Sequence, residues 1–299
     1  MRIRPQTADK IATTIFNIIA GILVLLLVFF AGYLIYQGKS KLNMDFLTSA
    51  PNSIEAGGGI GPPLFNSIYM VVLSMAISLP IGLAAGIYIA EYAKPSKGTK
   101  MIRFCIEALA SLPSIVIGLF GFLVFIQMTG WSFNLLSGAL AVSLLNLPVI
   151  TRISEDAIRN VPLSVKEASL ALGATHWQTI VKVLIPCAIP GLVTGLILTS
   201  GRVFGEAAAL IFTSGVSGYP LDFTNSNPFD SSSPLNPFRP AETLAVFIWK
   251  VNSEGTAPDA RTVADGAAAV LIICVFIFNI ASRVFGTLLN KRFAGKTNN

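Results

Sequence analysis

Six long apolar runs determine how this chain can fold. A helix that crosses a hydrocarbon core of about 30 Å needs about 20 apolar residues at a rise of about 1.5 Å each. Runs long enough to cross occupy residues 15–36, 64–90, 108–129, 133–151, 183–213 and 266–282. Only 12% of the 299 residues are charged, against roughly 25% in ordinary soluble domains. We therefore expect an all-α membrane protein that forms a single transmembrane domain of six helices over residues 1–299.

The basic residues predict which way these helices cross, because lysine and arginine gather on the cytoplasmic side of a membrane. One side of the six-helix arrangement collects Arg2, Arg4, Lys10, Lys94, Lys97, Lys100, Arg103, Arg152, Arg159, Lys166, Lys182, Arg283, Lys291, Arg292 and Lys296. The opposite side has a smaller set: Lys39, Lys41, Arg239, Lys250 and Arg261. Both termini and the loop 152–182 are therefore expected in the cytoplasm, and the loop 214–265 outside. We expect the basic residues to contact lipid rather than nucleic acid, because they flank apolar segments.

The number and positions of the cysteines and the single histidine argue against a fold held by disulfides or by a metal ion. Cys105, Cys187 and Cys274 lie in or beside apolar stretches, where an odd number of thiols indicates buried free cysteines. His176 is the sole histidine of the sequence. We expect neither a disulfide framework nor a metal site.

Small residues and prolines indicate closely packed, kinked helices. Gly82 and Gly86 have the small-xxx-small spacing that lets two membrane helices approach each other. Prolines lie within or at the edges of the runs at Pro80, Pro113, Pro148, Pro186 and Pro190. Such helices fit a transporter, although ordinary membrane packing also explains them.

The loop between the fourth and fifth runs contains a short helix signal. Pro162 and Ser164 resemble a helix start, with Ser164 as N-cap and Glu167 three residues later. Gly173 is placed to end the helix in the left-handed conformation. The predicted helix, 165–172, is too short to cross a membrane and too apolar to stay free in water. We expect it to dock on a cytoplasmic partner.

This loop resembles the Glu-Ala-Ala loop of binding-protein-dependent ABC importer permeases. The matching residues are Glu167, Ala168, Ser169, Gly173, Val183, Ile185 and Pro186, with mild replacements and the spacing of the family. The resemblance implies the type I importer permease fold. It also implies that residues 167–173 form a coupling helix seated in a groove of the ATPase subunit, with Pro186 completing the motif.

The resemblance also implies partners. The sequence has no Gly-x-x-x-x-Gly-Lys-Ser/Thr phosphate loop, so ATP and magnesium are expected on two copies of a separate ATPase subunit and no cofactor in this chain. A second, related permease subunit and an extracytoplasmic binding protein complete the expected assembly. We expect a pore-forming subunit in the cell membrane, not an enzyme.

Arg202 and Glu206 are an unusual charged pair inside the fifth run. At a spacing of four residues on a helix, they would share one face and could pair. Arg202 lies about 24 Å beyond Pro186 along such a helix, deep in the membrane, where ionisable groups usually face a cavity or a partner. Its planar guanidinium suits an oxyanion. A self-satisfied structural ion pair is the alternative interpretation.

The Gly-Arg-x-x-Gly-Glu pattern around these residues resembles that of phosphate-specific ABC importer permeases. The external segment 236–249 adds to the resemblance, which covers nearly the whole chain and suggests the A-type of the two permeases. By resemblance, Arg202 and Glu206 are candidate pathway residues and the binding protein is specific for phosphate. Ala207 replaces the usual threonine. In the same external loop, Thr243 is a possible cap for a helix over 244–251, and the loop offers a place for a binding protein to dock.

Other functions remain open at this point. A permease for molybdate, sulfate or phosphonate would share the coupling loop and differ in its solute pathway. An ion-gradient-driven secondary transporter would need no cytoplasmic partner, which the coupling loop speaks against. A membrane scaffold or sensor would alter signalling without moving a solute.

Overall fold

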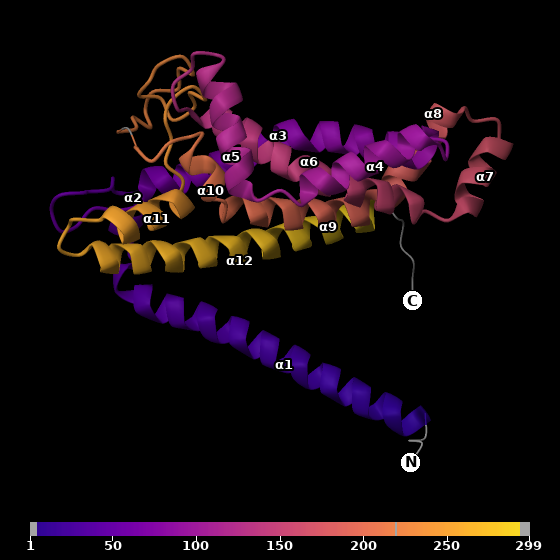
Figure 1. Cartoon of the computed structure of the whole chain (residues 1–299), viewed down its shortest axis with the longest axis horizontal. Helices are drawn as coiled ribbons and strands as arrows, with labels where there is room; N and C mark the ends of the chain where they lie inside the picture. Colours follow the sequence, from indigo (N-terminus) through magenta and orange to yellow (C-terminus); the bar gives the residue numbers. More distant parts are fainter. Residues whose placement is uncertain (1–4, 219, 294–299) are drawn as a thin grey trace.

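The computed structural model describes residues 5–218 and 220–293, and within them the chain is helical, with no β-strand (Figure 1). Arg2, Arg4 and Lys296, which contribute to the predicted orientation, lie outside the described residues.

Five helical segments of the described chain are long and apolar enough to cross a membrane: Asp9–Lys41, Gly61–Tyr92, Leu135–Arg159, His176–Phe204 and Ala260–Leu288. A bent pair, Lys97–Ala110 with Ser114–Gln127, would bring the number to six if it counts as one span. The α-helices within these segments are α1 (Pro5–Gly38), α3 (Gly61–Ile87), α6 (Leu135–Arg159), α9 (Ile185–Phe204) and α12 (Ala260–Phe293).

The predicted third span, 108–129, is wrong as a single straight helix. The structure has α4 (Lys97–Ala110), then α5 (Ser114–Phe122) continued by a π-helical turn, η3 (Leu123–Gln127), and the two parts are bent by 96°. Pro113 explains the bend, because its ring removes an N–H donor and forces the preceding residue out of the helical region. It stands at the N-cap of α5 with an extended backbone.

The predicted fourth span ends too early. Helix α6 continues past Thr151 to Arg159 and therefore contains Arg152, Glu155 and Asp156. Hydropathy marks where a helix leaves the apolar layer, but a charged side chain does not end a helix. The predicted loop 152–182 thus begins inside α6. The first, second and sixth helical segments, Asp9–Lys41, Gly61–Tyr92 and Ala260–Leu288, also extend beyond the predicted runs 15–36, 64–90 and 266–282.

The predicted fifth span, 183–213, begins too late and is not one continuous helix. The helical segment begins with α8 (His176–Thr179), passes through a π-helical turn, η4 (Ile180–Leu184), and continues as α9 to Phe204. Gly205 caps α9, and a four-residue helix, α10 (Ala208–Ile211), follows after the break. Glycine at such a position weakens the helix enough for the chain to turn.

Helices α3 and α6 pack closely, as the glycine spacing predicted. A Cβ atom on Gly82 would lie 2.7 Å from Ile150 Cγ2, and one on Gly86 would lie 2.5 Å from Ser154 Cβ. Both distances are below van der Waals contact, so only glycine fits. Nearer the start of α3, Met70 belongs to a core cluster with Leu135 and Val142, and all three are almost fully buried.

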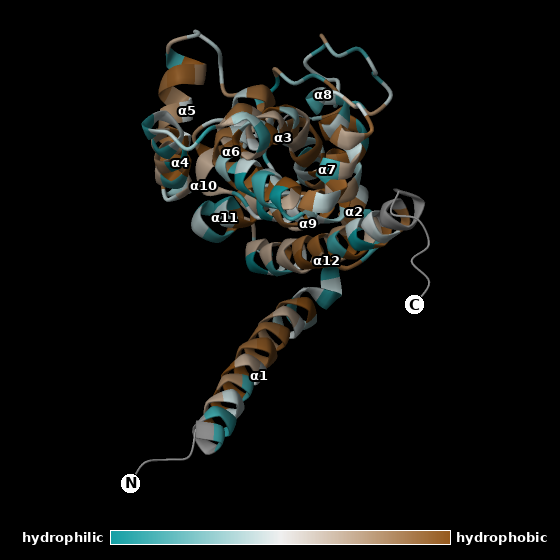
Figure 2. Ribbon diagram, turned by 90° about the vertical axis from the view of Figure 1, so that its right-hand side faces the viewer, coloured by the Kyte–Doolittle hydropathy of each residue, from teal (hydrophilic) through white to brown (hydrophobic). Residues whose placement is uncertain are grey.

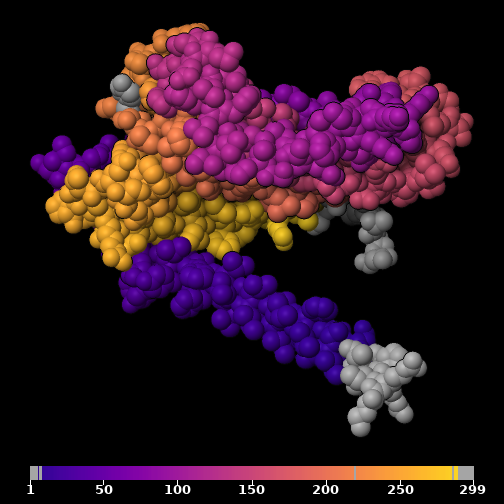
Figure 3. Space-filling model, viewed as in Figure 1, coloured from indigo at the N-terminus to yellow at the C-terminus, as the bar shows by residue number. Residues whose placement is uncertain are grey.

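Helix α1 stands apart from the other helices over most of its length (Figures 1 and 3). None of its most apolar window is buried within the chain. It approaches α12 near its end, where a Cβ on Gly38 would lie 2.5 Å from the carbonyl oxygen of Asp265. Figure 2 shows the long hydrophobic surface that α1 leaves open. Lipid or another apolar protein surface must cover it.

The two ends of the bundle differ and are named here after their helices. The α7 end holds α7 (Leu163–Ala171), α8 and the π-helical turn η2 (Tyr88–Tyr92) that ends the second span. The α11 end holds the 3₁₀ turn η1 (Lys39–Lys41), α2 (Met44–Thr48), the segments 212–218 and 220–243, and α11 (Leu244–Glu254). The start of α1 and the end of α12 both point toward the α7 end (Figure 1).

Candidate coupling and transport sites

The short helix of the Glu-Ala-Ala motif is present as α7, Leu163–Ala171 rather than 165–172. Pro162 is its N-cap, so the prediction that Ser164 caps it is wrong: Ser164 lies inside the first turn and no side chain caps the helix. The left-handed conformation of Gly173 is confirmed by its φ of +84°. A capping box does occur, but at α8, where Thr175 and Gln178 satisfy each other's backbone.

The outer surface of α7 and α8 is open and partly apolar. Glu167 and Ala168 are exposed, and Ser169 is half-buried. Around them Leu172 is 89% exposed, Leu163 65% and Trp177 61%. A group of large exposed apolar side chains at one end of a molecule is typical of a surface that another protein or lipid covers.

A carboxylate clasp, formed by Glu91, joins α7 and α8 to the second span. Glu91, in the π-helical turn η2, has a side chain that is 8% exposed. Its Oε2 atom accepts from Lys166 Nζ of α7 at 2.6 Å and lies 3.0 Å from His176 Nε2 of α8. The Tyr92 ring meets the His176 ring edge-on. One acidic side chain therefore holds both short helices against the end of the span.

A second junction lies beside the clasp. Glu155 of α6 has a side chain that is 8% exposed, and it pairs with Arg103 of α4 and, at 2.8 Å, with Arg159 Nε of its own helix. Arg159 also donates to the carbonyl oxygen of Ile89 at 3.1 Å. The first junction therefore ties α7 and α8 to the turn η2. The second ties α6 to α4 and to the same turn.

The remaining motif residues lie within or next to this region. Ser169 Oγ is 2.9 Å from Thr179 Oγ1, which links α7 to the start of the fifth span. Pro186 is half-buried at the first turn of α9, after the π-helical turn. The segment from Glu167 to Pro186 is therefore one folded unit and not a loose loop.

Arg202 and Glu206 do not pair as predicted. Arg202 is in the last turn of α9 and exposed, whereas Glu206 follows the end of the helix and is half-buried. Among the ion pairs of the described residues, none joins the two. Instead, Glu206 Oε1 accepts from the backbone N–H of Ala209 at 3.2 Å and so helps to start α10. The break at Gly205 separates the two side chains that an unbroken helix would have aligned.

Arg239 is a charged group buried in the α11 end, at 2% exposure. Its Nη2 atom donates to Asn66 Oδ1 of α3 at 2.7 Å and to the carbonyl oxygen of Pro234 at 3.0 Å. Asn66 in turn donates to the carbonyl oxygen of Glu242 at 2.9 Å. Burial lowers the pKa of Arg239 to about 10. This network fixes the segment before α11 onto the start of α3.

Glu242 is the buried carboxylate of this end, 2% exposed, and sits just before α11. Its Oε2 atom accepts from Lys250 Nζ at 3.3 Å. Burial raises the pKa of the Glu242 carboxyl, and the ammonium of Lys250 opposes this only in part. The predicted helix over 244–251 is confirmed as α11, but the Thr243 side chain makes no capping bond.

Sequence reasoning did not single out Glu91, His176, Arg239 or Glu242 as side chains that pair. Glu91 and Lys166 are separated by 75 residues, and Asn66 and Arg239 by 173. A weak signal existed, since Glu91 ends an apolar run and Arg239 and Glu242 stand among prolines in a loop. That pattern marks charged side chains in unusual surroundings but does not name their partners.

Comparison with known proteins agrees with these features. The sequence model of the family described as "Binding-protein-dependent transport system inner membrane component" matches residues 82–295. A "Probable ABC transporter permease protein YqgI" of Bacillus subtilis (strain 168) is 53% identical over 287 residues, which cover 96% of this chain and 98% of the relative. A "Phosphate transport system permease protein PstA" of Xylella fastidiosa (strain 9a5c) is 33% identical over 252 residues, which cover 84% and 82%.

Among solved structures, a bacterial ABC transporter that imports the acidic polysaccharide alginate has a similar fold. The TM-score is 0.63 at 13% sequence identity, and the alignment covers 95% of this chain and 99% of the other. The expected fold class, an all-α permease fold of the type I importers, is thereby confirmed; this likeness speaks for the fold alone.

Proposed function

The chain belongs to the family of binding-protein-dependent transport system inner membrane components, and from that premise we propose that it imports inorganic phosphate. As a member of this family it is a membrane-embedded permease subunit of an ABC importer. Such subunits are pore components rather than enzymes. The finer points, namely the solute, the partners and the direction of the chain across the membrane, are our proposal.

The observation that supports phosphate as the solute is the 33% identity, over most of both chains, to a phosphate transport system permease. The more similar relative, at 53% identity, has no solute in its name and so favours none. Competition by other oxyanions is therefore part of the test.

Arg202 supports an anionic solute. It stands in the last turn of α9, beside the break at Gly205, with an exposed guanidinium that has no carboxylate within 4 Å in the described chain. An arginine at membrane depth needs water, an anion or a neighbouring protein. Its planar fork of donors matches an oxyanion. We propose that Arg202 attracts phosphate in the pore and that Glu206, turned back onto α10, shapes the pore at the helix break.

The α7 end is proposed to face the cytoplasm and to receive the ATPase subunits. The basic residues favour this orientation, and the exposed apolar side chains Leu163, Leu172 and Trp177 surround the motif residues Glu167 and Ala168. ATP and magnesium bind the two ATPase subunits. Their closure pulls on α7, and the Glu91 clasp passes the movement to the spans, which expose the pore alternately outward and inward.

The remaining surfaces suit the other proposed partners. The open apolar surface of α1 can be covered by lipid and by a second, related permease subunit. With the α7 end in the cytoplasm, the α11 end would lie on the external side of the membrane. There the segments 212–218 and 220–243, together with α11, offer a broad surface to a phosphate-binding protein.

The proposal is tested by uptake of radiolabelled phosphate at micromolar concentration in cells with and without this chain. Arsenate, sulfate and molybdate serve as competitors. We expect uptake to require the chain and cellular ATP, and to be inhibited by arsenate alone. Phosphate uptake that is unchanged when the chain is deleted would remove phosphate as the solute.

Arg202→Gln tests the pathway. We expect uptake to be lost while the complex assembles normally, because the side chain is exposed and its replacement leaves no buried partner unsatisfied. Arg261→Gln is the matched control, since Arg261 is an exposed arginine on α12 at the α11 end. Uptake that survives in Arg202→Gln at the level of the control would contradict the pathway role.

A further inference from the structure

Helix α4 has one side that packs on the protein and one side that is open. Arg103, Ile106 and Leu109 recur every three residues along the side that packs. Arg103 pairs with Glu155 of α6, and Leu109 packs against a core cluster that includes Leu145 of α6. The open side, called the α4 face here, consists of exposed residues at spacings of three and four, which share one side of a helix: Lys97, Lys100, Met101, Phe104 and Ala108.

The middle of the α4 face is apolar. Met101 is 64% exposed and Phe104 is 66% exposed. Helix α4 belongs to the bent pair that forms one span together with α5 if the pair crosses the membrane, so these side chains lie in or next to the hydrocarbon layer. Large apolar side chains that the chain leaves open at such a place are covered by lipid chains or by another protein surface.

The beginning of the α4 face is basic. Lys97 and Lys100 are exposed, and a third exposed lysine, Lys94, lies three residues before the helix. The ion pairs of the described chain include none of these lysines. Residues 92–106 contain no aspartate or glutamate, and Glu107, seven residues beyond Lys100, lies in an ion pair of its own. Three positive charges are therefore left without a carboxylate partner in the described chain.

The spacing of these residues matches a phospholipid. Met101 follows Lys97 by four residues, so the two side chains are neighbours on one side of the helix. Phe104 follows Lys100 by the same spacing. A lysine lays its methylene stem along an apolar surface while its ammonium reaches the polar layer. A headgroup at the lysines therefore places acyl chains over Met101 and Phe104, whereas a free anion uses the lysines alone and leaves the apolar side chains uncovered.

We propose that the α4 face binds a phospholipid whose headgroup carries a net negative charge. The headgroup phosphate accepts from the ammonium groups of Lys97 and Lys100, and Lys94 adds a third positive charge beside them. An anionic headgroup is favoured over a zwitterionic one, because the same lysines repel the cation of the zwitterion. The bound lipid covers a helix whose other side is bonded to α6 through Arg103 and Glu155. The inference does not depend on which solute the permease imports.

The test maps where lipids attach to the intact transport complex in vesicles of phosphatidylcholine. The vesicles contain a trace of phosphatidylglycerol or of phosphatidylcholine that carries the same photoactivatable acyl chain. After illumination, mass spectrometry measures the labelling of the segment 97–109. We expect the phosphatidylglycerol probe to label this segment about tenfold more than the phosphatidylcholine probe, because two lysines each attract an anionic headgroup.

Helix α12 supplies the internal control. Phe276, Ile277 and Ile280 are exposed on it, and residues 266–282 contain no charged side chain. We expect both probes to label these residues equally. A general enrichment of anionic lipid around the complex would raise the labelling of both helices and is thereby distinguished from binding at the α4 face.

Variants test the two lysines directly. Lys97→Gln/Lys100→Gln removes both charges and leaves no buried partner unsatisfied, since both side chains are exposed. We expect the preference for phosphatidylglycerol on the segment 97–109 to fall to the level found on α12. Lys97→Arg/Lys100→Arg keeps the charges and should keep the preference.

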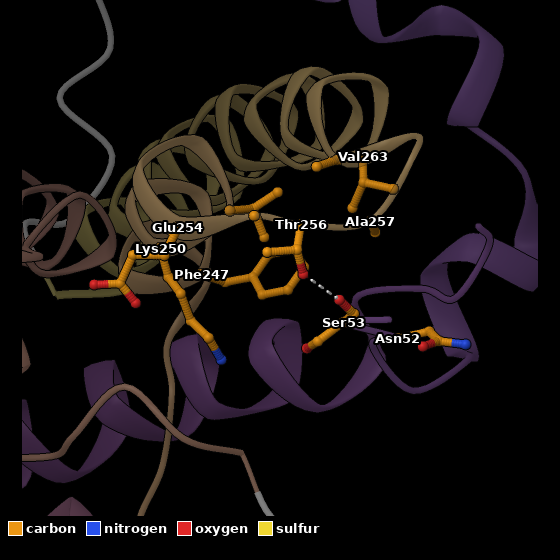
Figure 4. A pocket seen from close by; sticks show the side chains of 11 residues that line it. Asn52, Ser53, Phe247, Lys250, Glu254, Thr256, Ala257 and Val263 are labelled. Carbon is orange, nitrogen blue, oxygen red and sulfur yellow. Dashed lines mark hydrogen bonds between the residues drawn. The ribbon is translucent and has the colours of Figure 1, made fainter. Parts of the chain in front are cut away.

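The matched control is Lys39→Gln/Arg261→Gln, which removes two exposed charges at the α11 end. It should leave the preference on the segment 97–109 unchanged. Lys250 of the same end is kept in the control, because it pairs with Glu242 and lines a cavity of about 70 Å³ (Figure 4).

Equal labelling of the segment 97–109 by the two probes in the wild-type complex would overturn the proposal. Labelling by neither probe would also overturn it, because a protein partner would then cover the α4 face. A preference that persists in Lys97→Gln/Lys100→Gln would contradict the role of the lysines. The readout needs no transported solute, so it stands or falls separately from the proposed function.

Discussion

The two ends of this permease each contain a buried carboxylate paired with a lysine, and the two carboxylates differ in what they leave unsatisfied. At the α7 end, Glu91 accepts from Lys166 and approaches His176, both on the short helices that it holds. At the α11 end, Glu242 pairs with Lys250 and has an oxygen with no partner beside a cavity. The first arrangement joins separate elements, whereas the second leaves a buried acceptor without a donor.

The difference teaches how similar residue pairs serve different tasks. Glu91 joins elements that are far apart in sequence, and each bond crosses from a span to a docking helix. Glu242 and Lys250 are eight residues apart and lie on one short segment, so their bond holds no separate elements together. We infer that force passes through the α7 end, whereas the bond between Glu242 and Lys250 acts within the α11 end.

Arg239→Met is expected to have the largest effect, and it acts on the α11 end alone. The change leaves Asn66 Oδ1 and the carbonyl oxygen of Pro234 without their donor. Loss of donors to buried acceptors costs about 2–5 kcal/mol in total. We expect a lower thermal midpoint of the complex and reduced yield. The matched control, Arg261→Met, should change the midpoint little, and equal losses in both variants would contradict the role of the Arg239 network.

Glu91→Gln is expected to have the next largest effect, and it acts on the α7 end. It removes the charge that Lys166 and His176 share, which costs about 1–3 kcal/mol because Lys166 stays partly exposed. We expect uptake to fall strongly while ATP hydrolysis continues, since α7 can still dock but no longer pulls firmly on the second span. Uptake and hydrolysis are measured in the same proteoliposomes.

Glu107→Gln is the matched control for Glu91. Glu107 makes an exposed pair with Arg152 at 3.9 Å, with both side chains more than two-thirds in solvent. Such pairs contribute little, so uptake should be unchanged. A clasp role for Glu91 would be contradicted if the two variants behaved alike.

The titration of Glu242 should appear as a pH dependence of stability, with a smaller effect than the two variants above. Burial raises the pKa of this carboxyl in the folded protein, so the folded state holds the proton more tightly than the unfolded state does. Stability gained in this way is fully present below the ordinary carboxyl pKa and is lost as pH rises through the raised pKa. Relative to Glu242→Gln, the wild-type thermal midpoint should therefore fall as pH rises. A difference that is constant across this range would contradict the burial of a titrating carboxyl.

Asp259, at the same end, should give a pH dependence of stability with the opposite sign and a still smaller magnitude. The hydrogen bond from Lys41, at 2.8 Å, lowers the pKa of Asp259. Its contribution to stability is present above the ordinary carboxyl pKa and is lost as pH falls through the lowered value. Comparison of wild type with Asp259→Asn in acid should show this loss, because the asparagine does not titrate. A midpoint difference that grows in acid would contradict the sign.

Local sequence signals predicted the features that depend on neighbouring residues. Apolar runs located the membrane-crossing helices, because span length is set by the thickness of the bilayer. Gly173 was predicted to be left-handed because glycine adopts that conformation without a Cβ penalty. Gly82 and Gly86 indicated the close helix contact that α3 makes with α6.

Features that depend on backbone breaks and distant partners were not predictable in the same way. Pro113 and Gly205 were each visible in the sequence, but membrane helices tolerate both residue types, so a bend of 96° and a broken helix could not be distinguished from a continuous span. The Glu91 clasp needs the three-dimensional approach of residues 91, 166 and 176. The cavity at the α11 end is lined by four segments that are separate in the sequence, so it exists only in the folded chain.

The number of phosphate ions imported per ATP hydrolysed, measured in proteoliposomes at saturating phosphate, tests the division between the two ends most directly. We expect this ratio to fall in Glu91→Gln and to remain at the wild-type value in Glu242→Gln, because the bond between Glu242 and Lys250 joins no separate elements. A wild-type ratio in Glu91→Gln, or a lowered ratio in Glu242→Gln, would contradict the account.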